Sequence, residues 1–401
     1  MVHLSARTSI LSLAPLFAAF SPASSLIARS NYSTWMASSI MSRQQGVLTG
    51  TGDSSELLQA GFTQKAFRQL IDQHPDEAQY YNSYVSKSVE SVIPVVINAT
   101  KDTTYPLDRF SSGNNLIHFF LANNNDTYLD AIHALRESID LQPRNAEGGL
   151  WYYIYPQWSY LDGMYSFAPF LTAYTTLFDA DPTLNTTAIN DVLFQLDLLW
   201  QHCLRNDSGL LVHGYDDSKT AVWADPATGA SPHVWGRSLG WYVMALADLL
   251  EIIPVEHDSD EWKTLKSRFQ QLAFGVVDAV DPDSGAWWQL LDQPGREGNY
   301  IESSGSAMFV YGLLKGSRLG YIPSENATAV TELASRAYEY VVDTFVVDNG
   351  NGTISYNGTV SVCSLNSTAS YEYYVGQPIK YDSVLGSAAF VLASLEYERL
   401  S

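Results

Sequence analysis

Apolar residues recur at helical spacing along most of this 401-residue chain, and this periodicity limits what the chain can fold into. Side chains three or four positions apart share one face of an α-helix, so a repeated apolar stripe predicts a helix that packs against others. The stripes run through residues 189–203, 239–253, 262–276, 330–341 and 385–395. Long runs with the alternating pattern of half-buried strands are missing. The sequence therefore predicts an all-α protein.

Helix boundaries can be placed from residues that favour starts and stops. Asp258 and Glu261 have the spacing of a capping box before Trp262, and Ser324 stands where a cap should precede the helix through Val330. Pro254 directly follows the stripe at 239–253, and a proline there should end the helix.

A turn motif with a glycine between polar and apolar residues repeats along the chain. Its copies are residues 147–151, 207–211, 283–287 and 349–354, with glycines at 149, 209, 285 and 352. Each interval is long enough for two helices and their connections. Glycine ends helices in many proteins, so each copy alone is weak evidence. The regular spacing favours about six stacked helical hairpins. A closed double ring of helices would gather the connecting loops at one end as a cup.

The N-terminal 25 residues have the pattern of a secretory signal peptide. Arg7 gives a short basic region, residues 10–20 are apolar, and residues 21–25 are small enough for cleavage. The alternative is a buried first helix. The apolar run is too short to span a bilayer, and no later stretch reaches that length without charges. We expect a secreted protein, with no membrane span, whose single domain covers residues 26–401.

Glycosylation sequons agree with export, and they far outnumber what chance gives. The sequon asparagines are Asn31, Asn98, Asn125, Asn185, Asn206, Asn326, Asn351, Asn357 and Asn366. The two cysteines, Cys203 and Cys363, can form one bridge or remain as two buried thiols.

The charge and the missing motifs narrow the function. The net charge of −21 argues against a nucleic-acid partner, and an anionic substrate would need a locally basic pocket. Metal-ligand clusters, phosphate-binding glycine loops, dinucleotide fingerprints and serine nucleophile elbows are missing from the sequence. Carboxylate chemistry remains, which is the usual equipment for acting on glycosides. The many Trp and Tyr residues suit sugar binding as well as core packing.

Two aspartates stand out as candidate acids or bases. Asp162 lies among aromatic and apolar residues, where burial would raise its pKa and let it carry a proton near neutral pH. The alternative is an N-cap for the helix through Tyr174, and the two roles are compatible. Asp108 has the same two interpretations, with Arg109 as an ion-pair partner.

Three other residue types complete the candidate site. Arg237, between Trp235 and Trp241, needs an anionic partner if it is buried, and a substrate carboxylate would serve. The two tryptophans either stack on a sugar or pack the core. His213 alone is more typical of a structural loop histidine.

Four segments together resemble glycoside hydrolase family 105, the unsaturated rhamnogalacturonyl hydrolases, and more distantly the unsaturated glucuronyl hydrolases. These segments are residues 105–113, 158–165, 209–216 and 233–242, with further similarity at 35–43, 299–309 and 373–376. The stretch Trp-Gly-Arg-Ser-Leu-Gly-Trp at 235–241 is the most specific piece. The resemblance implies an (α/α)6 barrel of six helical hairpins, in agreement with the repeat.

The resemblance also implies roles for individual residues. The family's acid/base aspartate falls on Asp162, its second active-site aspartate on Asp108, and its substrate-contacting residues on His213, Arg237 and Trp241. Relatives often carry a histidine shortly after the glycine turn, where this chain has Tyr152 and Tyr153. This departure bears on a minor contact or on the preferred leaving sugar.

The implied reaction hydrates the C4=C5 double bond that a polysaccharide lyase leaves in a terminal uronic acid. The expected partner is therefore a pectin-derived oligosaccharide that ends in an unsaturated uronic acid. We expect the protein to be a monomer and to need no metal or organic cofactor. An ordinary glycosidase acting on a saturated bond and a non-catalytic sugar-binding protein are the alternatives.

Overall fold

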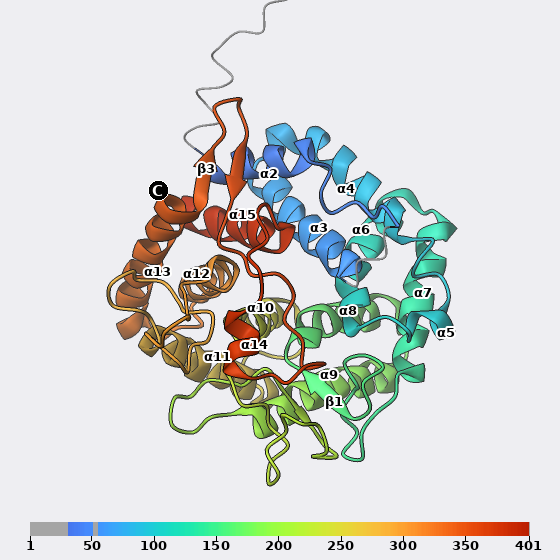
Figure 1. Cartoon of the computed structure of the whole chain (residues 1–401). Helices are drawn as coiled ribbons and strands as arrows, with labels where there is room; N and C mark the ends of the chain where they lie inside the picture. Colours follow the sequence, from blue (N-terminus) through green and yellow to red (C-terminus); the bar gives the residue numbers. More distant parts are fainter. Residues whose placement is uncertain (1–30, 51–54, 401) are drawn as a thin grey trace, which may run out of the picture.

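Helical hairpins follow one another around a closed ring in the computed structural model, which describes residues 31–50 and 55–400 (Figure 1). The helices of the inner ring are α3 (Glu56–Gln73), η3 with α6 (Leu107–Ser112 and Gly113–Asn123), α8 (Asp162–Phe178), α10 (Gly236–Ile252), α12 (Ser303–Arg318) and α15 (Val384–Glu398). Their outer partners are α4 (Ala78–Val92), α7 (Asp126–Leu141), α9 (Pro182–Cys203), α11 (Asp260–Asp278), α13 (Ser324–Phe345) and α2 (Tyr32–Ser42).

The helix contacts close this ring. Each inner element packs against the next around the barrel, and α15 returns to pack against α3. Each outer helix packs most extensively against one inner helix, in the pairs α3–α4, α6–α7, α8–α9, α10–α11, α12–α13 and α15–α2. The predicted all-α class and the (α/α)6 barrel of six hairpins are confirmed.

Short elements and loops gather at one end of the barrel, where the inner helices begin (Figure 1). Strand β1 (Trp158–Tyr160) pairs antiparallel with β2 (Gly214–Asp216), and β3 (Val346–Asp348) pairs antiparallel with β4 (Ile354–Tyr356). Helix α14 (Tyr371–Val375) lies on the loop that crosses this end. Of the remaining short elements, α5 (Ala99–Asp102) precedes η3, whereas η2 (Pro75–Glu77) connects the C-terminal end of α3 to α4 at the opposite end of the barrel.

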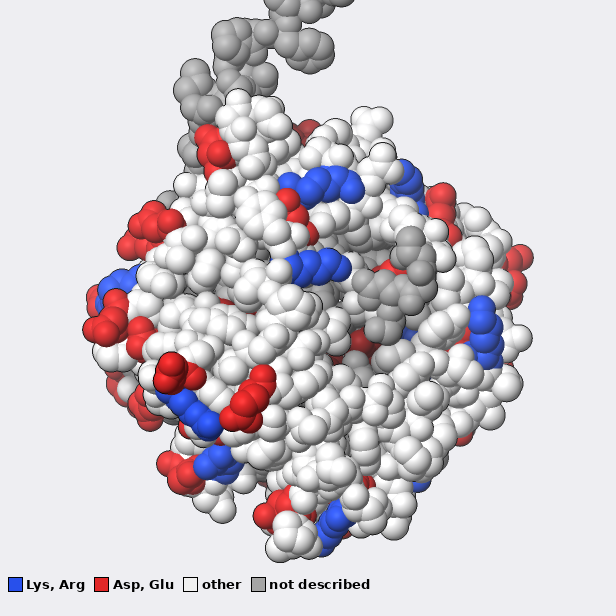
Figure 2. Space-filling model, in the orientation of Figure 1, with Lys and Arg blue, Asp and Glu red and all other residues white. Residues whose placement is uncertain are grey.

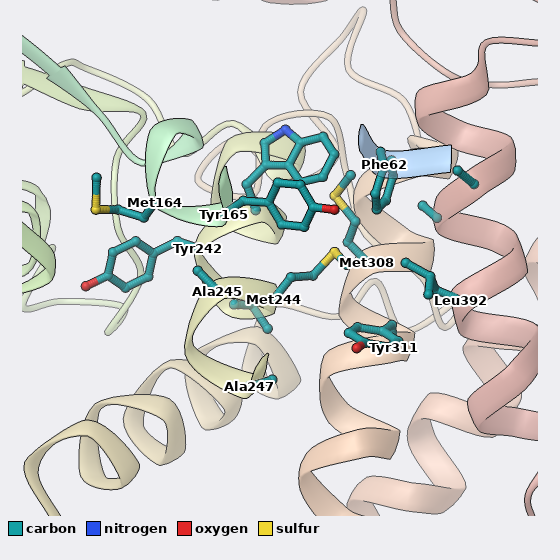
Figure 3. Close-up of a cluster of buried hydrophobic side chains, with 14 of the residues drawn as sticks. Phe62, Met164, Tyr165, Tyr242, Met244, Ala245, Ala247, Met308, Tyr311 and Leu392 are labelled. Carbon is teal, nitrogen blue, oxygen red and sulfur yellow. The ribbon is translucent and has the colours of Figure 1, made fainter. Parts of the chain in front are cut away.

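The centre of the barrel is filled by large side chains from several inner helices (Figure 3). The ring of Trp241 packs edge-on against Phe62, with centroids 4.6 Å apart, and contacts Tyr165 at 4.5 Å. Helices α10 and α12 approach closely because Gly240 has no side chain: a Cβ there would lie 2.8 Å from Met308 Sδ. This packed layer forms the floor beneath the loop end.

The predicted helix starts are shifted by one residue. Ser259, and not Asp258, caps α11 by accepting a hydrogen bond from the Trp262 backbone N–H. Ser324 is the first residue of α13, and Pro323 holds the cap position. The stop before Pro254 is confirmed, since α10 ends at Ile252 with Ile253 as its C-cap.

The repeated glycine turns are present. Gly209, Gly285 and Gly352 have positive φ values of 70°, 71° and 88°, a conformation that glycine adopts without strain. In the first copy the left-handed residue is Gly148, with φ 92°, and not the aligned Gly149. The motif thus marks a similar turn after four of the outer helices, α7, α9, α11 and α13.

Both cysteines are buried free thiols, which decides between the two alternatives. Seven of the nine sequon asparagines are exposed, whereas Asn31 and Asn185 are half-buried. The predicted signal peptide, residues 1–25, lies outside the described residues. Within the described part, no helix is both long and apolar enough to cross a membrane.

Candidate active site

A cavity of about 130 Å³ lies at the loop end of the barrel. Figure 2 shows the hollow in this face, with acidic side chains visible inside it. The cavity is lined by Ser55, Leu58, Pro106, Asp108, Tyr152, Tyr153, Tyr155, Tyr160, Asp162, Trp235, Arg237, Trp241, Val362, Cys363, Ser364 and Leu385. Five inner elements contribute residues at or near their N-terminal ends. Helix N-termini carry partial positive charge, so this arrangement favours an anionic ligand in a strongly acidic protein.

Pairing between β1 and β2 brings two of the predicted site residues together. Tyr160 pairs with Gly214, and the Leu161 backbone N–H donates to the His213 carbonyl at 3.1 Å. The next residues on each side are therefore neighbours: His213 Nε2 lies 3.4 Å from Asp162 Oδ2. A short sheet thus places the start of α8 beside the segment that contains the histidine.

Asp162 is the first residue of α8 and is only 8% exposed. Its Oδ2 accepts a hydrogen bond from Ser238 Oγ at 2.5 Å, on the neighbouring inner helix α10. The N-cap interpretation is wrong, because Leu161 occupies the cap position and Asp162 makes no capping bond. An N-cap residue lies outside the helix, with its side chain folded back over the first turn. This carboxyl group instead points away from its own helix and into the cavity wall.

Asp108 lies on the 3₁₀ helix η3 and is 4% exposed. Its Oδ2 accepts a hydrogen bond from Tyr152 Oη at 2.8 Å, while Oδ1 is buried without a hydrogen-bond partner among the described residues. Burial raises the pKa of Asp108 to about 7; the Tyr152 hydrogen bond lowers it, and the nearby Asp162 raises it further. The cavity therefore contains a carboxyl group that can exchange a proton near neutral pH.

Arg109 is not the ion-pair partner of Asp108 that the sequence suggested. Its guanidinium donates to Ser138, to Gln142 Oε1 and to the Tyr105 carbonyl, behind the cavity. The two side chains leave a tight 3₁₀ turn in different directions. Arg109 consequently does little to stabilise the ionised form of the Asp108 carboxyl group.

His213 lies behind Asp162, outside the set of cavity-lining residues. It is 1% exposed, and its Nδ1 is 2.7 Å from Tyr374 Oη. With the ring proton on Nε2, Nδ1 accepts from the Tyr374 hydroxyl and the N–H points toward Asp162. The histidine thus contacts the carboxyl group rather than the open cavity.

Arg237 is 1% exposed and lines the cavity. Its Nη1 donates to the Val360 carbonyl at 2.7 Å, and its Nη2 donates to the Ser361 carbonyl. The guanidinium also lies 4.9 Å from the Trp235 ring centroid. No carboxylate in the described part of the chain forms an ion pair with it. A buried cation held by neutral groups is a favourable site for an anion.

Both predicted tryptophans combine packing with cavity lining. Trp235 donates its Nε1–H to Gln289 Oε1 at 3.1 Å, and Trp241 joins the aromatic layer below the cavity. They are 2% and 1% exposed. Each ring is fixed by its neighbours, and each contributes an edge or face to the cavity wall.

Comparisons with known proteins identify the family of this chain. The profile of Glycosyl Hydrolase Family 88 matches residues 35–401. The chain belongs to the family 88 and 105 glycoside hydrolases. A family 105 glycoside hydrolase from C. acetobutylicum is 32% identical, over 92% of this chain and 99% of that one, with a TM-score of 0.79.

Further relatives extend this picture. The 24.9 kDa protein in the picA locus of Rhizobium radiobacter is 36% identical over 194 residues, 47% of this chain and 82% of that protein. The unsaturated glucuronyl hydrolase of Bacillus sp. GL1 has the same fold at 14% identity, with a TM-score of 0.66 over 94% of this chain and 97% of that one. The protein is a glycosidase of this group.

Sequence reasoning missed several residues of this glycosidase's site. Ser238 holds Asp162, Tyr374 contacts His213, and Cys363 lines the cavity. Ser238 lies inside the specific stretch at 235–241, so the motif pointed to this segment but did not show that the serine binds Asp162. Among residues 31–50 and 55–400, no three His, Cys, Asp or Glu side chains gather as a metal site.

Proposed function

We propose that the protein hydrolyses a terminal 4,5-unsaturated uronic acid from lyase-generated oligosaccharides, by hydrating the C4=C5 double bond. The observation that carries this proposal is a small cavity lined by two buried carboxyl groups and by a buried arginine that forms no ion pair with any described carboxylate. A cavity of this volume has room for about ten water-sized positions, comparable with one sugar ring. It suits the end of a chain better than its middle.

Each step needs only the side chains of the cavity. The protonated Asp162 donates its proton to C4, which leaves an oxocarbenium ion across C5 and the ring oxygen. Water then adds at C5 and returns a proton to Asp162, and the hemiketal opens to release the neighbouring sugar. The Asp108 carboxylate stabilises the positive charge, and Arg237 binds the uronate carboxylate.

The charges of the cavity support a neutral leaving sugar, as in rhamnogalacturonan fragments. Arg237 is the one Lys or Arg among the described residues that line the cavity, and the uronate carboxylate occupies it. A sulfated or second acidic sugar would meet Asp108 and Asp162 without a further cation. Tyr153 and Tyr155 instead offer rings to the apolar face of a deoxy sugar.

A disaccharide screen tests this function. Unsaturated uronyl-rhamnose, the same disaccharide with a saturated uronic acid, and a sulfated analogue are compared by sugar release and by loss of the double bond's ultraviolet absorbance. We expect turnover of the first compound alone, with deuterium at C4 of the released keto-uronate in heavy water. Turnover of the saturated disaccharide, or unlabelled C4, would establish ordinary glycosidic hydrolysis instead.

We propose in addition that the enzyme is secreted and acts outside the cell. The signal-like residues 1–25 and the nine sequons support this location. Mass spectrometry of protein from the culture medium should find an N-terminus near Leu26 and N-glycans at several sequons. An intact N-terminus on unglycosylated protein would contradict it.

A further inference from the structure

Tyr152 is the side chain in closest polar contact with the second carboxyl group. Its Oη donates to Asp108 Oδ2 at 2.8 Å, and its ring stacks on Tyr160 with centroids 4.3 Å apart and planes 12° apart. Both tyrosines line the cavity. The stack fixes the plane of the ring, and therefore the direction of the hydroxyl group.

The backbone of Tyr152 joins the two segments that present the carboxyl groups. Its carbonyl accepts from the Leu107 N–H at 2.9 Å, one residue before Asp108. Its own N–H donates to the Trp158 carbonyl at 2.8 Å, in the strand that leads to Asp162. This single residue thus couples the position of η3 to the position of the β1–α8 segment.

The residue after Asp162 makes room for this ring. A Cβ at Gly163 would lie 2.8 Å from Leu107 Cδ1 and 3.4 Å from Tyr152 Cδ2. The first turn of α8 therefore packs directly under the tyrosine and the start of η3. The contact between Tyr152 and Asp108 is supported from below as well as from the side.

The tyrosine hydroxyl can only donate to its partner at the working pH of an enzyme. Burial raises the pKa of Tyr152 well above its ordinary value, and the neighbouring Asp108 and Asp162 raise it further. A neutral hydroxyl that donates to a carboxyl oxygen stabilises the ionised form of that group. Asp162 has a different donor, Ser238 Oγ, so the Tyr152 hydroxyl group acts on Asp108.

We propose that Tyr152 is a positioning residue that holds the Asp108 carboxyl group in its ionised form and in a fixed orientation. Its hydroxyl is the one hydrogen-bond donor to Asp108 among the described residues, and the stacked ring fixes the direction of that bond. Without the hydroxyl, burial and the neighbouring Asp162 would raise the pKa of Asp108 further. The proposed function, on which the inference rests, requires the Asp108 carboxylate beside the developing positive charge.

The substitution Tyr152→Phe tests this role with little change in packing. It keeps the stacked ring and removes the hydroxyl donor. We expect the acid limb of the kcat/KM profile to move up by about one pH unit, because Asp108 loses the donor that favours its ionised form. The plateau should fall by up to about tenfold, because the Asp108 carboxylate is less well oriented. The matched control is Tyr155→Phe, which removes a hydroxyl from the same cavity but not from a carboxyl contact. Its acid limb should stay at the wild-type pH whatever happens to KM.

A titration without substrate separates this inference from the proposed function. Carbon-13 NMR of labelled aspartate carboxyl groups, assigned with Asp108→Asn, follows Asp108 directly. We expect its apparent pKa to be higher in Tyr152→Phe than in the wild type and unchanged in Tyr155→Phe. Unchanged titration and an unmoved acid limb in Tyr152→Phe would overturn the proposal. A wild-type enzyme inactive on unsaturated sugars would refute the function but leave this titration valid.

Discussion

Two aspartates at opposite ends of the same barrel are buried to a similar degree but differ in the number and charge of their partners. Asp108 at the loop end has one hydrogen-bond donor, Tyr152, and a buried Oδ1 without a partner among the described residues. Asp248, near the C-terminal end of α10, binds Lys65 and Lys315 and accepts from Tyr311 Oη at 2.7 Å. It lines a separate cavity of about 290 Å³ at the far end.

The electrostatic consequence has opposite signs at the two ends. Burial raises the pKa of Asp108 to about 7. Burial also acts to raise the pKa of Asp248, but Lys315 and Lys65 outweigh it and hold that pKa below its ordinary value. A compensated carboxylate is fixed in one state, whereas an uncompensated one can change its state during a reaction. The difference distinguishes a structural charge from a chemical one in the same fold.

The largest effect is expected for Asp162→Asn, which removes the acid from the loop end. Asparagine can still accept from Ser238, and Asp162 does not cap α8, so the fold should persist. Turnover of the unsaturated disaccharide should fall by about 10²–10⁴-fold, the range for a positioned acid/base. Steady-state kinetics and circular dichroism check both parts. A folded variant with near-native turnover would remove Asp162 from the mechanism.

The far end should respond in stability instead. Asp248→Asn leaves Lys65 and Lys315 without their shared counter-charge and should lower the free energy of unfolding by about 3–5 kcal/mol. Denaturant unfolding measures this loss, and kcat per folded molecule should stay close to the wild type. A loss of kcat without a loss of stability would show that the far end also takes part in catalysis.

Asp108→Asn should stabilise the folded protein while it lowers the activity. The folded-state pKa near 7 lies above the unfolded value near 4, so the folded state binds more protons between these values and stability falls as the pH rises through this window. Removal of the charge should therefore raise stability by about 1–3 kcal/mol at pH 8 and by much less at pH 5. Thermal unfolding at both values checks this. An equal shift at both would show that Asp108 does not titrate as described.

The smallest effect concerns the grip on the substrate. Arg237→Lys keeps a positive charge but loses the planar group that donates to the Val360 and Ser361 carbonyls. We expect KM to rise by about tenfold, with a smaller change in kcat. Unchanged KM would mean that this arginine only fixes the loop at 360–361, and that the substrate carboxylate binds elsewhere.

The sequence predicted what depends on local pattern. Periodicity located the helices, the glycine repeat indicated the hairpins, and the 235–241 stretch located the arginine and its tryptophans. Cap positions were displaced by one residue at α11, where Asp258 and Ser259 stand side by side and each can cap. They were displaced by one residue at α13 as well, where Pro323 holds the cap position before Ser324. The same local logic produced the incorrect cap at Asp162.

Contacts between distant segments could not be predicted in this way. Tyr152 and Asp108 are 44 positions apart, and Lys65 and Asp248 are 183 apart. Whether a buried carboxyl group has one partner or three depends on how the ring closes, and no spacing along the chain encodes it. Arg109 illustrates the point: adjacency to Asp108 suggested an ion pair, whereas the 3₁₀ turn directs the two side chains apart.

Closure of the inner ring has a consequence for how the molecule forms. Helix α15 packs against α3, and Glu398 binds the Ser33 backbone N–H at 3.1 Å, across 365 positions. Leu385, at the start of the same helix, lines the cavity. Contacts of such long sequence separation slow folding, because the chain loses the entropy of closing the long loop before the contacts stabilise it. During synthesis the cavity therefore stays incomplete until residues 384–398 have left the ribosome, and a chain arrested before them would be inactive rather than partly active.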